Sequence, residues 1–596
     1  MTIVFAAAVL ISVQPALAQL RIVGSISGTV QDPTGAVVPN ARVVLKDQKT
    51  GLTKESTTTE AGTFLFPDLA SGSYQVTVSL AGFKTELIPS VSVSTSKTTD
   101  VRVTLEVGQP TETVTITEGA AQVLESSSQL VTNTLVSKTI TELPLGNRGN
   151  ALALARLAQG ASPPIGGDTR YNNLPGGAVN VTVDGINDAS NGFKSGGTVF
   201  FMTVPVRLGA LEEQSVETGG LGADSGAQSG ANVKFTTKRG GNKYHGSGFY
   251  EPQSERFNAN TWTRNAQGLQ RLLNRTQNYG FNFGGPLVPF TSLKKKAFFF
   301  VNYERAYSPV LNSRTVTVLT PAAQAGIYTY QVTVNNTTQV LTTNVLALGA
   351  TKAGPRPLDS VTQDILAINN KIPLGATKIA GTDLNRDTYT WGAENNNFAY
   401  FPAARFDVFA TPKHQVTWTW NYRHNWQAGE RRIPVPDISR TNPFRLGYFI
   451  WSAAVQSTFS PRVLNEIRYG VQHSGDSNAS AAYGPYYIYK GVPLRIGQNL
   501  QFANGNNPPS PTVPFIDQAN VTGRHFITTI YDTMTLERGN HTFTIGGSYR
   551  KTDWKDTGVV FAVPTYGTGT PSGDPLQVST AFAGLPTTEQ GNAIAL

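Results

Sequence analysis

Residues 219–250, with the sequence GGLGADSGAQSGANVKFTTKRGGNKYHGSGFY, join two parts of the chain that differ in composition. Gly, Ala and Ser dominate the first half, and then Val233 and Phe235 alternate with polar residues before Gly240 and Gly241 end the run. This pattern predicts a short strand that closes one domain. Beyond Tyr250, aromatic residues recur in alternation, which indicates long β-strands. The segment therefore separates small modules from a large β-domain.

The composition of the 596-residue chain favours strands and turns. Only 15% of the residues are charged, while Gly (58), Phe (29) and Tyr (21) are abundant. The absence of cysteine excludes thiol catalysis, disulfide bonds and cysteine-bound zinc. The net charge of +9 is spread along the chain, so we expect a solvated or lipid-facing surface and no nucleic-acid partner.

The N-terminus has the pattern of a secretory signal. An apolar run from Ile3 to Val13 precedes Ala16-Leu17-Ala18, a small-x-small cleavage pattern, so residues 1–18 are expected to be a signal peptide; a buried strand is the alternative. No later run approaches the ~18 apolar residues of a membrane helix. A membrane-spanning form of this chain would therefore be a β-barrel.

Residues 24–107 alternate short β-prone segments with turn signals, such as DPTG at 32–35 and ASG at 70–72. This predicts a small β-sandwich. The stretches GSISGTVQDPTGAVVPNARVVL and EAGTFLFPDLASGSYQVTVSLAGF resemble the carboxypeptidase regulatory-like domain, which has a transthyretin-like fold. This region has no histidine and no cluster of metal ligands, so we expect a binding or spacer module and not a peptidase.

The linker 108–119 contains a short β-prone segment, Thr113-Val114-Thr115-Ile116-Thr117. Such a segment can pair with the sheet edge of a partner protein. It resembles the TonB box of TonB-dependent outer-membrane receptors, and the resemblance implies that a TonB-type periplasmic energy-transducing protein grips these residues. A plain linker, or the last strand of the sandwich, would have the same pattern, so both alternatives stay open.

Residues 120–242 resemble the α+β plug domain of the same receptors. Three blocks in the family's order carry the resemblance: ITELPLGNRGNALALARLAQGA, VNVTVDGINDAS and LGALEEQSVETGGLGADSGAQSGANVKFTTKRGGN. The Ala/Leu pattern of residues 139–160 predicts a helix. Asp184-Gly185 predicts a hairpin turn.

From residue 243 onward, apolar and polar residues alternate as in strands with one lipid-facing side. Between Gln415 and Trp426, valine, tryptophan and tyrosine alternate with glutamine, threonine, asparagine and arginine. The alternation recurs around Ile467 and around Ile545. We expect nine strands, at 246–252, 277–285, 297–306, 398–409, 415–426, 448–459, 463–473, 525–536 and 542–552.

The links between these strands are alternately short and long. The short links are 286–296, 410–414, 460–462 and 537–541, and the long ones are 253–276, 307–397, 427–447 and 474–524. Transmembrane β-barrels have tight periplasmic turns and long outer loops, whereas a soluble sandwich has no reason to sort its loops. FGGPL followed by KKKAFFFVNYERA also resembles the second and third strands of Oar-like receptors. We therefore expect an antiparallel transmembrane β-barrel in contact with outer-membrane lipid.

The barrel in this chain is expected to be incomplete. Plugged outer-membrane transporters have about 22 strands, whereas this sequence offers nine and ends at Leu596 without a terminal aromatic residue. An open sheet edge is not viable in lipid. We therefore interpret residues 243–596 as the N-terminal part of a barrel, and the chain as a piece of a longer protein.

The sequence contains no HExxH, GxSxG, Walker P-loop or GxGxxG pattern, and its six histidines are scattered. We expect no catalytic residue, metal or cofactor, and no enzyme activity. The resemblance implies a receptor in the Gram-negative cell outer membrane that takes up a ligand actively into the periplasm. The ligand could be a siderophore, an oligosaccharide or a peptide, and no motif fixes its binding residues. The alternative is an outer-membrane surface or adhesion protein without transport.

Overall fold

The computed structural model describes most of the chain between residues 23 and 558. The expected signal peptide, at 1–18, lies outside the described residues. These are 23–95, 97–109, 113–115, 131–143, 151–165, 168–174, 178–188, 202–219, 230–288, 296–355, 363, 376–379, 383–394, 396–427, 444–460, 462–474, 476–478, 487–489, 492–494, 521–538 and 541–558.

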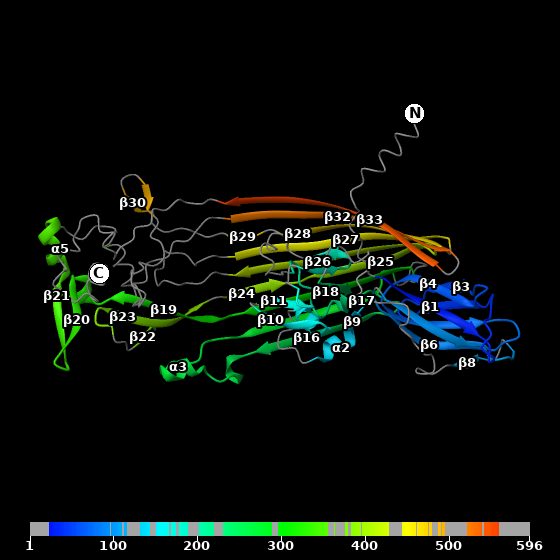
Figure 1. The fold of residues 1–596 in the computed structure, drawn as a ribbon, viewed down its shortest axis with the longest axis horizontal. Helices are drawn as coiled ribbons and strands as arrows, with labels where there is room; N and C mark the ends of the chain where they lie inside the picture. Colours follow the sequence, from blue (N-terminus) through cyan, green and yellow to red (C-terminus); the bar gives the residue numbers. More distant parts are fainter. Residues whose placement is uncertain are drawn as a thin grey trace, which may run out of the picture.

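The first part of the chain forms a β-sandwich, as the short alternating segments predict (blue in Figure 1). Its two sheets have the strand orders β4-β1-β7 and β3-β2-β5-β6-β8. Buried aliphatic side chains such as Ile26, Val43 and Val76 fill the space between them. The strands are β1 (Gly24–Gln31), β2 (Arg42–Asp47), β3 (Thr53–Thr57), β4 (Thr63–Leu69), β5 (Gly72–Ser79), β6 (Thr85–Val93), β7 (Thr98–Thr104) and β8 (Thr113–Thr115).

A second unit, which we call the plug, is built on a five-stranded mixed sheet of order β13-β12-β15-β14-β9. The predicted turn is present: Asp184 (φ 47°) and Gly185 (φ 81°) link β12 to β13 in the left-handed conformation that a two-residue hairpin needs. The plug's elements are β9 (Val131–Val136), α2 (Ser137–Glu142), the 3-10 helix η1 (Ala151–Leu157), β10 (Ala161–Ile165), β11 (Asp168–Tyr171), β12 (Val179–Val183), β13 (Ile186–Asn187), β14 (Leu211–Gly219) and β15 (Ala231–Thr237).

The prediction of one helix over residues 139–160 is wrong. Helix α2 ends at Glu142, and Leu143 already has an extended backbone (φ −67°, ψ 135°). The physical reason is Pro144, because a proline disfavours the helical conformation in the residue before it. The Ala/Leu pattern reappears in η1, which buries Ala151 and Leu154 against the plug sheet.

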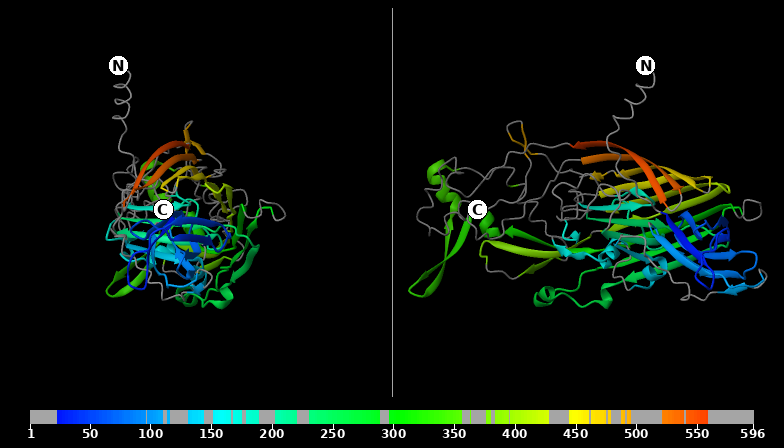
Figure 2. Two further views of the ribbon diagram at one scale, coloured as in Figure 1. Left: turned by 90° about the vertical axis from the view of Figure 1, so that its right-hand side faces the viewer. Right: turned by 45° about the vertical axis from the view of Figure 1, so that its right-hand side comes forward.

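The nine predicted long strands are all present in one antiparallel sheet, which curves around the plug (Figures 1 and 2). The fourth is divided into β24 and β25 at Pro402, which has no N–H for a sheet ladder. Within the described residues the sheet does not close. Its strands are β16 (His245–Gln253), β17 (Thr276–Pro286), β18 (Ala297–Ser308), β24 (Asn397–Tyr400), β25 (Ala403–Thr411), β26 (His414–Gln427), β27 (Phe444–Ser460), β28 (Val463–Ser474), the short β29 (Asp476–Asn478), β32 (Val521–Arg538) and β33 (His541–Gly558).

The two faces of this sheet differ as the alternation predicts. Ile545 and Tyr549 point outward and are each 61% exposed, whereas Thr419 and Arg468 point toward the plug and are 2% exposed. Strand β18 is a partial exception, because Phe300 faces inward and packs into the plug's apolar core. Among the described residues, no helix combines the length and apolar character needed to cross a membrane.

The sheet has two unlike ends (Figure 1). The short connections, such as those between β25 and β26 and between β27 and β28, lie at the end that carries the sandwich. The opposite end carries folded elements inside what the sequence predicted only as long links. These are η4 (Glu255–Phe257), α3 (Trp262–Ala266), β19 (Leu311–Leu319), α4 (Pro321–Gln324), β20 (Ile327–Val334), β21 (Thr337–Asn344), α5 (Val345–Ala353), β22 (Thr377–Ile379), β23 (Arg386–Glu394), β30 (Tyr487–Tyr489) and β31 (Val492–Leu494).

Candidate functional site

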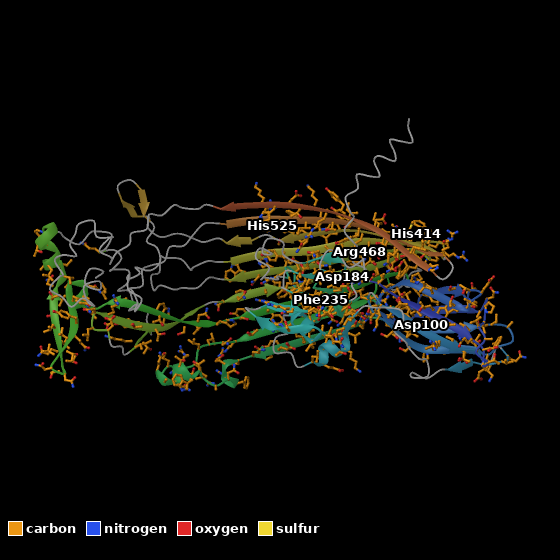
Figure 3. All side chains as sticks on the ribbon, in the orientation of Figure 1. Asp100, Asp184, Phe235, His414, Arg468 and His525 are labelled. Carbon is orange, nitrogen blue, oxygen red and sulfur yellow. The ribbon has the colours of Figure 1, made fainter. Side chains whose placement is uncertain are left out.

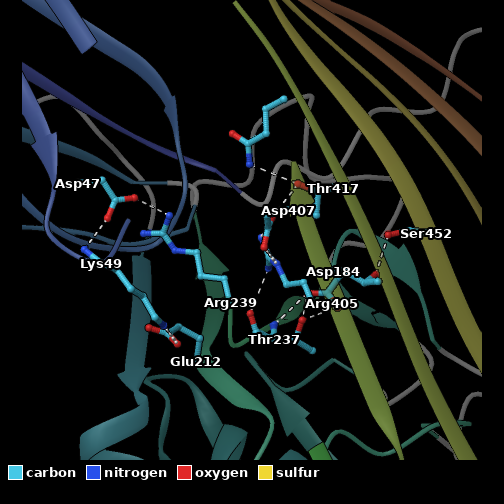
Figure 4. A network of polar contacts seen from close by, with 12 residues as sticks. Asp47, Lys49, Asp184, Glu212, Thr237, Arg239, Arg405, Asp407, Thr417 and Ser452 are labelled. Atoms are coloured by element: carbon cyan, nitrogen blue, oxygen red, sulfur yellow. Dashed lines mark hydrogen bonds and ion pairs between the residues drawn. The ribbon is translucent and has the colours of Figure 1, made fainter. Parts of the chain in front are cut away.

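The plug is fastened to the sandwich by a group of charged residues that we call the interdomain clamp: Asp47, Lys49, Glu212, Glu213 and Arg239. Figure 4 shows all of them except Glu213. Arg239 follows β15, and its Nη1 donates to Oδ2 of Asp47, at the end of β2, over 2.7 Å. The two side chains are only 7% and 9% exposed. The other oxygen of Asp47 accepts the backbone N–H groups of Lys49 and Thr50. Asp47 is thus fixed by its own loop and presented to the plug.

The acidic pair at the start of β14 completes the clamp. Nζ of Lys49 lies 3.1 Å from Oε2 of Glu212. Glu213 accepts the N–H of Thr95 (2.8 Å) and the hydroxyl of Ser71, two loops of the sandwich. Burial raises the pKa of Glu213 and is opposed by these hydrogen bonds, whereas burial lowers the pKa of Lys49 and Glu212 opposes that shift. The buried Glu213 and the partly exposed Lys49 therefore each have a partner across the interface.

The plug also makes charged contacts with the sheet that surrounds it. Arg207 donates from Nε to Oε1 of Glu304 on β18 over 2.7 Å, and both side chains are almost completely buried. The guanidinium of Arg207 also lies 4.3 Å from the ring centroid of Phe401. Removing either member would leave an uncompensated charge in a dry site, so this pair fixes the plug relative to the sheet.

The Asp184-Gly185 turn is held against β28 and β15. Nη1 of Arg468 donates to the backbone oxygen of Asp184 over 2.8 Å. Figure 3 labels both residues, near the middle of the sheet. A Cβ at Gly185 would lie 3.1 to 3.4 Å from the Arg468 side chain, so glycine permits both the positive φ and this close approach. The Asp184 carboxylate accepts the N–H and hydroxyl of Thr237, and Arg405 of β25 donates to the Thr237 carbonyl over 3.1 Å. The turn therefore joins the plug to two barrel strands.

A buried carboxyl group lies just beyond this turn. Asp188 accepts the hydroxyl of Thr203 and the N–H of Val204, and Nε2 of Gln472 on β28 donates to the same Thr203 hydroxyl over 2.7 Å. Burial raises the pKa of Asp188 to about 8, while Thr203, Val204 and Arg423 act in the opposite direction. The group is therefore mainly protonated at neutral pH. This makes it the plug's most evident pH-sensitive contact among the described residues.

The sandwich, the plug and the sheet meet around one small cavity of about 30 Å³. Ser71, Glu212, Arg239, Arg405 and Arg468 are among its lining residues. This volume suits one or two water molecules and is too small for a nutrient ligand. Within the described ranges, no group of three or more His, Asp or Glu residues could hold a metal ion.

The sequence-predicted TonB-interaction residues lie away from the clamp. Thr113, Val114 and Thr115 form β8, which pairs in parallel with Thr85–Leu87 of β6 at the edge of the sandwich. Ile116 and Thr117 lie outside the described residues. The backbone pairing matches the alternative of a last sandwich strand, and an interaction of residues 113–117 with a TonB-type protein stays a prediction.

Sequence reasoning missed the charges that fasten the plug. Glu304 is preceded by Asn302 on the same face of β18, and period two could have marked it as inward-facing. Arg207 and Arg239 lie outside regular strands, so no periodic pattern could have indicated that they are buried.

A curved sheet with lipid-compatible aromatic residues outside and a polar, charge-anchored plug inside defines the class of plugged outer-membrane β-barrel proteins. The comparisons with known proteins agree. Residues 236–594 match the family model described as "Outer membrane beta barrel domain", and residues 25–106 match "Carboxypeptidase regulatory-like domain". The chain belongs to the outer membrane beta-barrel family. Its location is the Gram-negative outer membrane, and the resemblances to the carboxypeptidase regulatory-like domain and to Oar-like receptors are confirmed.

Among curated proteins, the chain is similar to the TonB-dependent transporter Oar of Myxococcus xanthus, with 25% identity over 315 residues, which is 50% of this chain and 28% of Oar. A similar solved structure is the outer membrane transporter YddB from Escherichia coli (TM-score 0.43, 13% identity, 71% of this chain and 48% of YddB). Another is the ferric enterobactin receptor PfeA from Pseudomonas aeruginosa (TM-score 0.39, 10% identity, 71% and 49%). The chain thus spans about a quarter to a half of the length of these relatives, which are named as transporters and receptors and not as enzymes.

Proposed function

We propose that this chain is part of a receptor that takes up a ligand across the outer membrane, driven by a TonB-type protein in the periplasm. The observation that carries the proposal is the plug, which is held inside the curved sheet by buried charged contacts such as Arg207 with Glu304. A solute can pass only after some of these contacts break. Since no ATP-binding or other catalytic motif occurs in the sequence, the energy must come from a partner.

The polar character of these contacts supports a plug that is remodelled and not a permanent seal. The Asp184 turn, Thr203 and Arg207 contact the sheet through hydrogen bonds and ion pairs, which water can replace when the plug moves. A wholly apolar interface would instead expose oily surface on opening. Residues Thr113–Thr115, the described part of the segment, lie at the sandwich end of the molecule, which is the end with short turns and hence the periplasmic side of a barrel of this kind (Figure 1).

Uptake can be tested on the full-length gene product with proline substitutions in the segment. Val114→Pro combined with Ile116→Pro removes two N–H groups that a partner strand would need. Val114→Thr combined with Ile116→Val is the matched control, because it keeps every N–H. We expect both variants to reach the outer membrane and to show heat-modifiable mobility on gels, and only the proline variant to lose energy-dependent accumulation of a panel of ferric siderophores, oligosaccharides and peptides.

Contact with the partner can be tested without knowing the ligand. Because the chain has no cysteine, Thr115→Cys provides a single thiol for disulfide cross-linking to a TonB-type protein that carries its own cysteine. We expect cross-links that disappear when the inner-membrane proton gradient is collapsed, and none from the control Thr98→Cys in β7. Outer-membrane recovery of the wild type and of both variants without energy-dependent uptake of any ligand of the panel would instead favour the surface or adhesion protein, which the projecting outer elements could serve.

A further inference from the structure

The outer end of the molecule carries a hairpin, β20–β21, whose composition is unusual for an exposed sheet. No charged residue and no proline occurs from Ile327 to Asn344. The register runs without a bulge from Ile327 opposite Asn344 to Val334 opposite Thr337. Natural proteins protect exposed strand edges with charges, prolines, bulges or a covering segment. This hairpin has none of the first three.

The hairpin is rigid enough to act as a template. Asn335 (φ 49°) and Asn336 (φ 62°) form its two-residue turn, and two positive φ angles match the twist of paired strands. At the base, the N–H of Val345 donates to the carbonyl of Gly326 over 2.8 Å. The rings of Tyr328 and Tyr330 stack with centroids 6.0 Å apart, and Tyr328 is 5% exposed. The root is therefore packed while the far part extends from it (Figures 1 and 2).

One contact reveals how the hairpin's edges bind. The amide side chain of Asn385 accepts the N–H of Thr329 and donates to its carbonyl, with both distances 2.7 Å. An amide is a copy of a peptide group, so Asn385 occupies the β20 edge as one residue of a neighbouring strand would. Near the base of the hairpin, the backbone groups on the outer edge of β20 are therefore already hydrogen-bonded, and their partner is an amide group.

The edge of β21 presents the same chemistry over a longer distance. Thr342 is paired with Thr329, and residues two and four positions away along β21 turn their N–H and C=O groups the same way. These are Val340 and Thr338. Among the described residues, none of the three outward peptide groups has a backbone hydrogen bond. Val340 is 57% exposed and Leu341 is 40% exposed, so the edge is open and flanked by apolar side chains.

We propose that the β21 edge, Thr338–Thr342, is a docking site for an extended, uncharged peptide segment that adds as a third strand. A row of alternating N–H and C=O groups is complementary to an extended polypeptide backbone and not to a sugar or a metal chelate. Because neither strand of the hairpin carries a charged residue, its edge would not select a peptide by charge. Apolar residues at alternate positions of the peptide would lie beside Leu341, on the face that carries Tyr330 and Val334. The proposal rests on the proposed receptor function only for placing this edge outside the cell.

Binding is tested on the full chain in detergent micelles, without a TonB-type protein. The probe is a fluorescein-labelled peptide in which threonine and valine alternate over about eight residues, the length of a strand of this size, with a lysine at each end for solubility. A second probe has the same side chains and a methyl group on every backbone nitrogen, so that neither edge of the extended peptide keeps a donor. We expect fluorescence anisotropy to detect the first peptide and not the second, because methylation removes the donors.

Val340→Pro removes an outward N–H and leaves the β20–β21 ladder intact, and we expect it to weaken binding at least about ten-fold, with Thr338→Pro acting in the same way. Val340→Thr, which keeps the N–H, and Gln331→Pro, on the opposite edge, should bind within about two-fold of the wild type. Chymotrypsin cleavage after Tyr330 reports whether Val340→Pro or Thr338→Pro has opened the hairpin. The proposal is overturned if Val340→Pro and Thr338→Pro bind the unmethylated peptide as tightly as the wild type does. It is also overturned if the wild type binds the methylated and unmethylated peptides equally tightly.

Three further outcomes are decisive. A concentration-dependent dimer that forms without peptide and is lost in Val340→Pro would assign the edge to a second copy of this chain and would overturn the peptide. A chain that binds the peptide but accumulates no ligand of the panel in energised cells would support the docking site and contradict the transport function. If the wild type does not bind the peptide but takes up another ligand in an energy-dependent way, the transport function is supported and the docking site is contradicted.

Discussion

The interdomain clamp makes a quantitative prediction through Asp47. In Asp47→Asn, the remaining side-chain oxygen can still accept the N–H groups of Lys49 and Thr50, but the new NH₂ group faces the guanidinium of Arg239. Arg239 then loses a charge-assisted hydrogen bond at a site where its side chain is 7% exposed. A lost bond of this kind costs about 2 kcal/mol, and breaking a buried pair costs about 3 to 5 kcal/mol in total. We use about 3 kcal/mol, because Asp407 still lies near Arg239 as a second negative charge.

This cost should appear as undocking of the sandwich and not as unfolding, because Arg239 regains water when the interface opens. A change of about 3 kcal/mol shifts the docking equilibrium about 100-fold. Two amide groups report docking directly: Thr95 N–H, bound to Glu213, and Asn242 N–H, bound to the Lys49 carbonyl. Their hydrogen exchange should accelerate by a similar factor, while the buried strand residue Val30 keeps its protection.

Two controls separate the charge pair from the interface as a whole. Lys49→Met breaks a pair whose side chains are 26% and 21% exposed, so exchange should rise less than about five-fold. Asp47→Asn combined with Arg239→Met removes both charges and should restore most of the protection, as buried pairs replaced together often do. Exchange at Thr95 and Asn242 that stays within about three-fold of the wild type in Asp47→Asn would refute the clamp, and so would equal acceleration at Val30.

Three other perturbations test the plug and the barrel face. Arg207→Met should lower the temperature at which gel mobility changes by leaving Glu304 unpaired, at a cost of about 3 to 5 kcal/mol, and Glu304→Gln added to it should recover most of the loss. Burial raises the pKa of Asp188 to about 8, from an ordinary value near 4. Its contribution to stability is therefore complete below about pH 4 and is lost as pH rises toward 8. Thermal unfolding measured from pH 4 to 9 should show this loss of stability in the wild type and not in Asp188→Asn. Ile545→Lys on the exposed outer face should destabilise the protein in lipid vesicles by about 2 to 4 kcal/mol if the residue lies near the bilayer midplane, whereas Thr544→Lys on the other face should cost little, as measured by urea unfolding. The role of the Arg207–Glu304 pair would be contradicted if adding Glu304→Gln did not restore the transition temperature. The role of Asp188 would be contradicted if Asp188→Asn and the wild type lost stability in parallel with rising pH. The assignment of the lipid-facing side would be contradicted if lysine at 544 and lysine at 545 cost the same unfolding free energy.

The long strands could be predicted from the sequence because successive residues of a membrane-barrel strand face lipid and interior in turn, which gives an apolar/polar alternation with a period of two residues. Strand β26 was expected at 415–426 and runs from His414 to Gln427. The ends at the outer side were harder: β27 was expected from 448 and begins at Phe444. Alternation indicates a strand only while its two faces meet different surroundings, and that contrast fades where a strand leaves the lipid.

The elements missed at the outer end carry this contrast less consistently. Strand β21 is mainly exposed on both faces, and its sequence TTQVLTTN has no clear period. Strand β20 is partly buried and does alternate, with Tyr328 and Tyr330 on one face, but it lies inside a stretch that was assigned as one long link. The buried ion pairs were missed for another reason. Burial of Arg207 and Arg239 depends on residues far away in the sequence, Glu304 and Asp47, and a single sequence gives no signal for such a pairing.

The position of β9 suggests where the plug would yield first. Among the described residues, β9 is the first strand after Thr113–Thr115, and it lies at the edge of the plug sheet, paired only with β14 in the strand order of that sheet. Tension applied at residues 113–117 would first release the three paired residues of β8 from β6 and would then act on β9. An edge strand can leave without breaking the ladder between β12 and β15, which holds Val181 and Val233 in the apolar core. The sandwich, still docked through Arg239 at the end of β15, would meanwhile hold the opposite end of that core in place. If the proposed pull occurs, the clamp and the edge position of β9 together favour partial unfolding of the plug from its N-terminal edge over expulsion of the plug as one body.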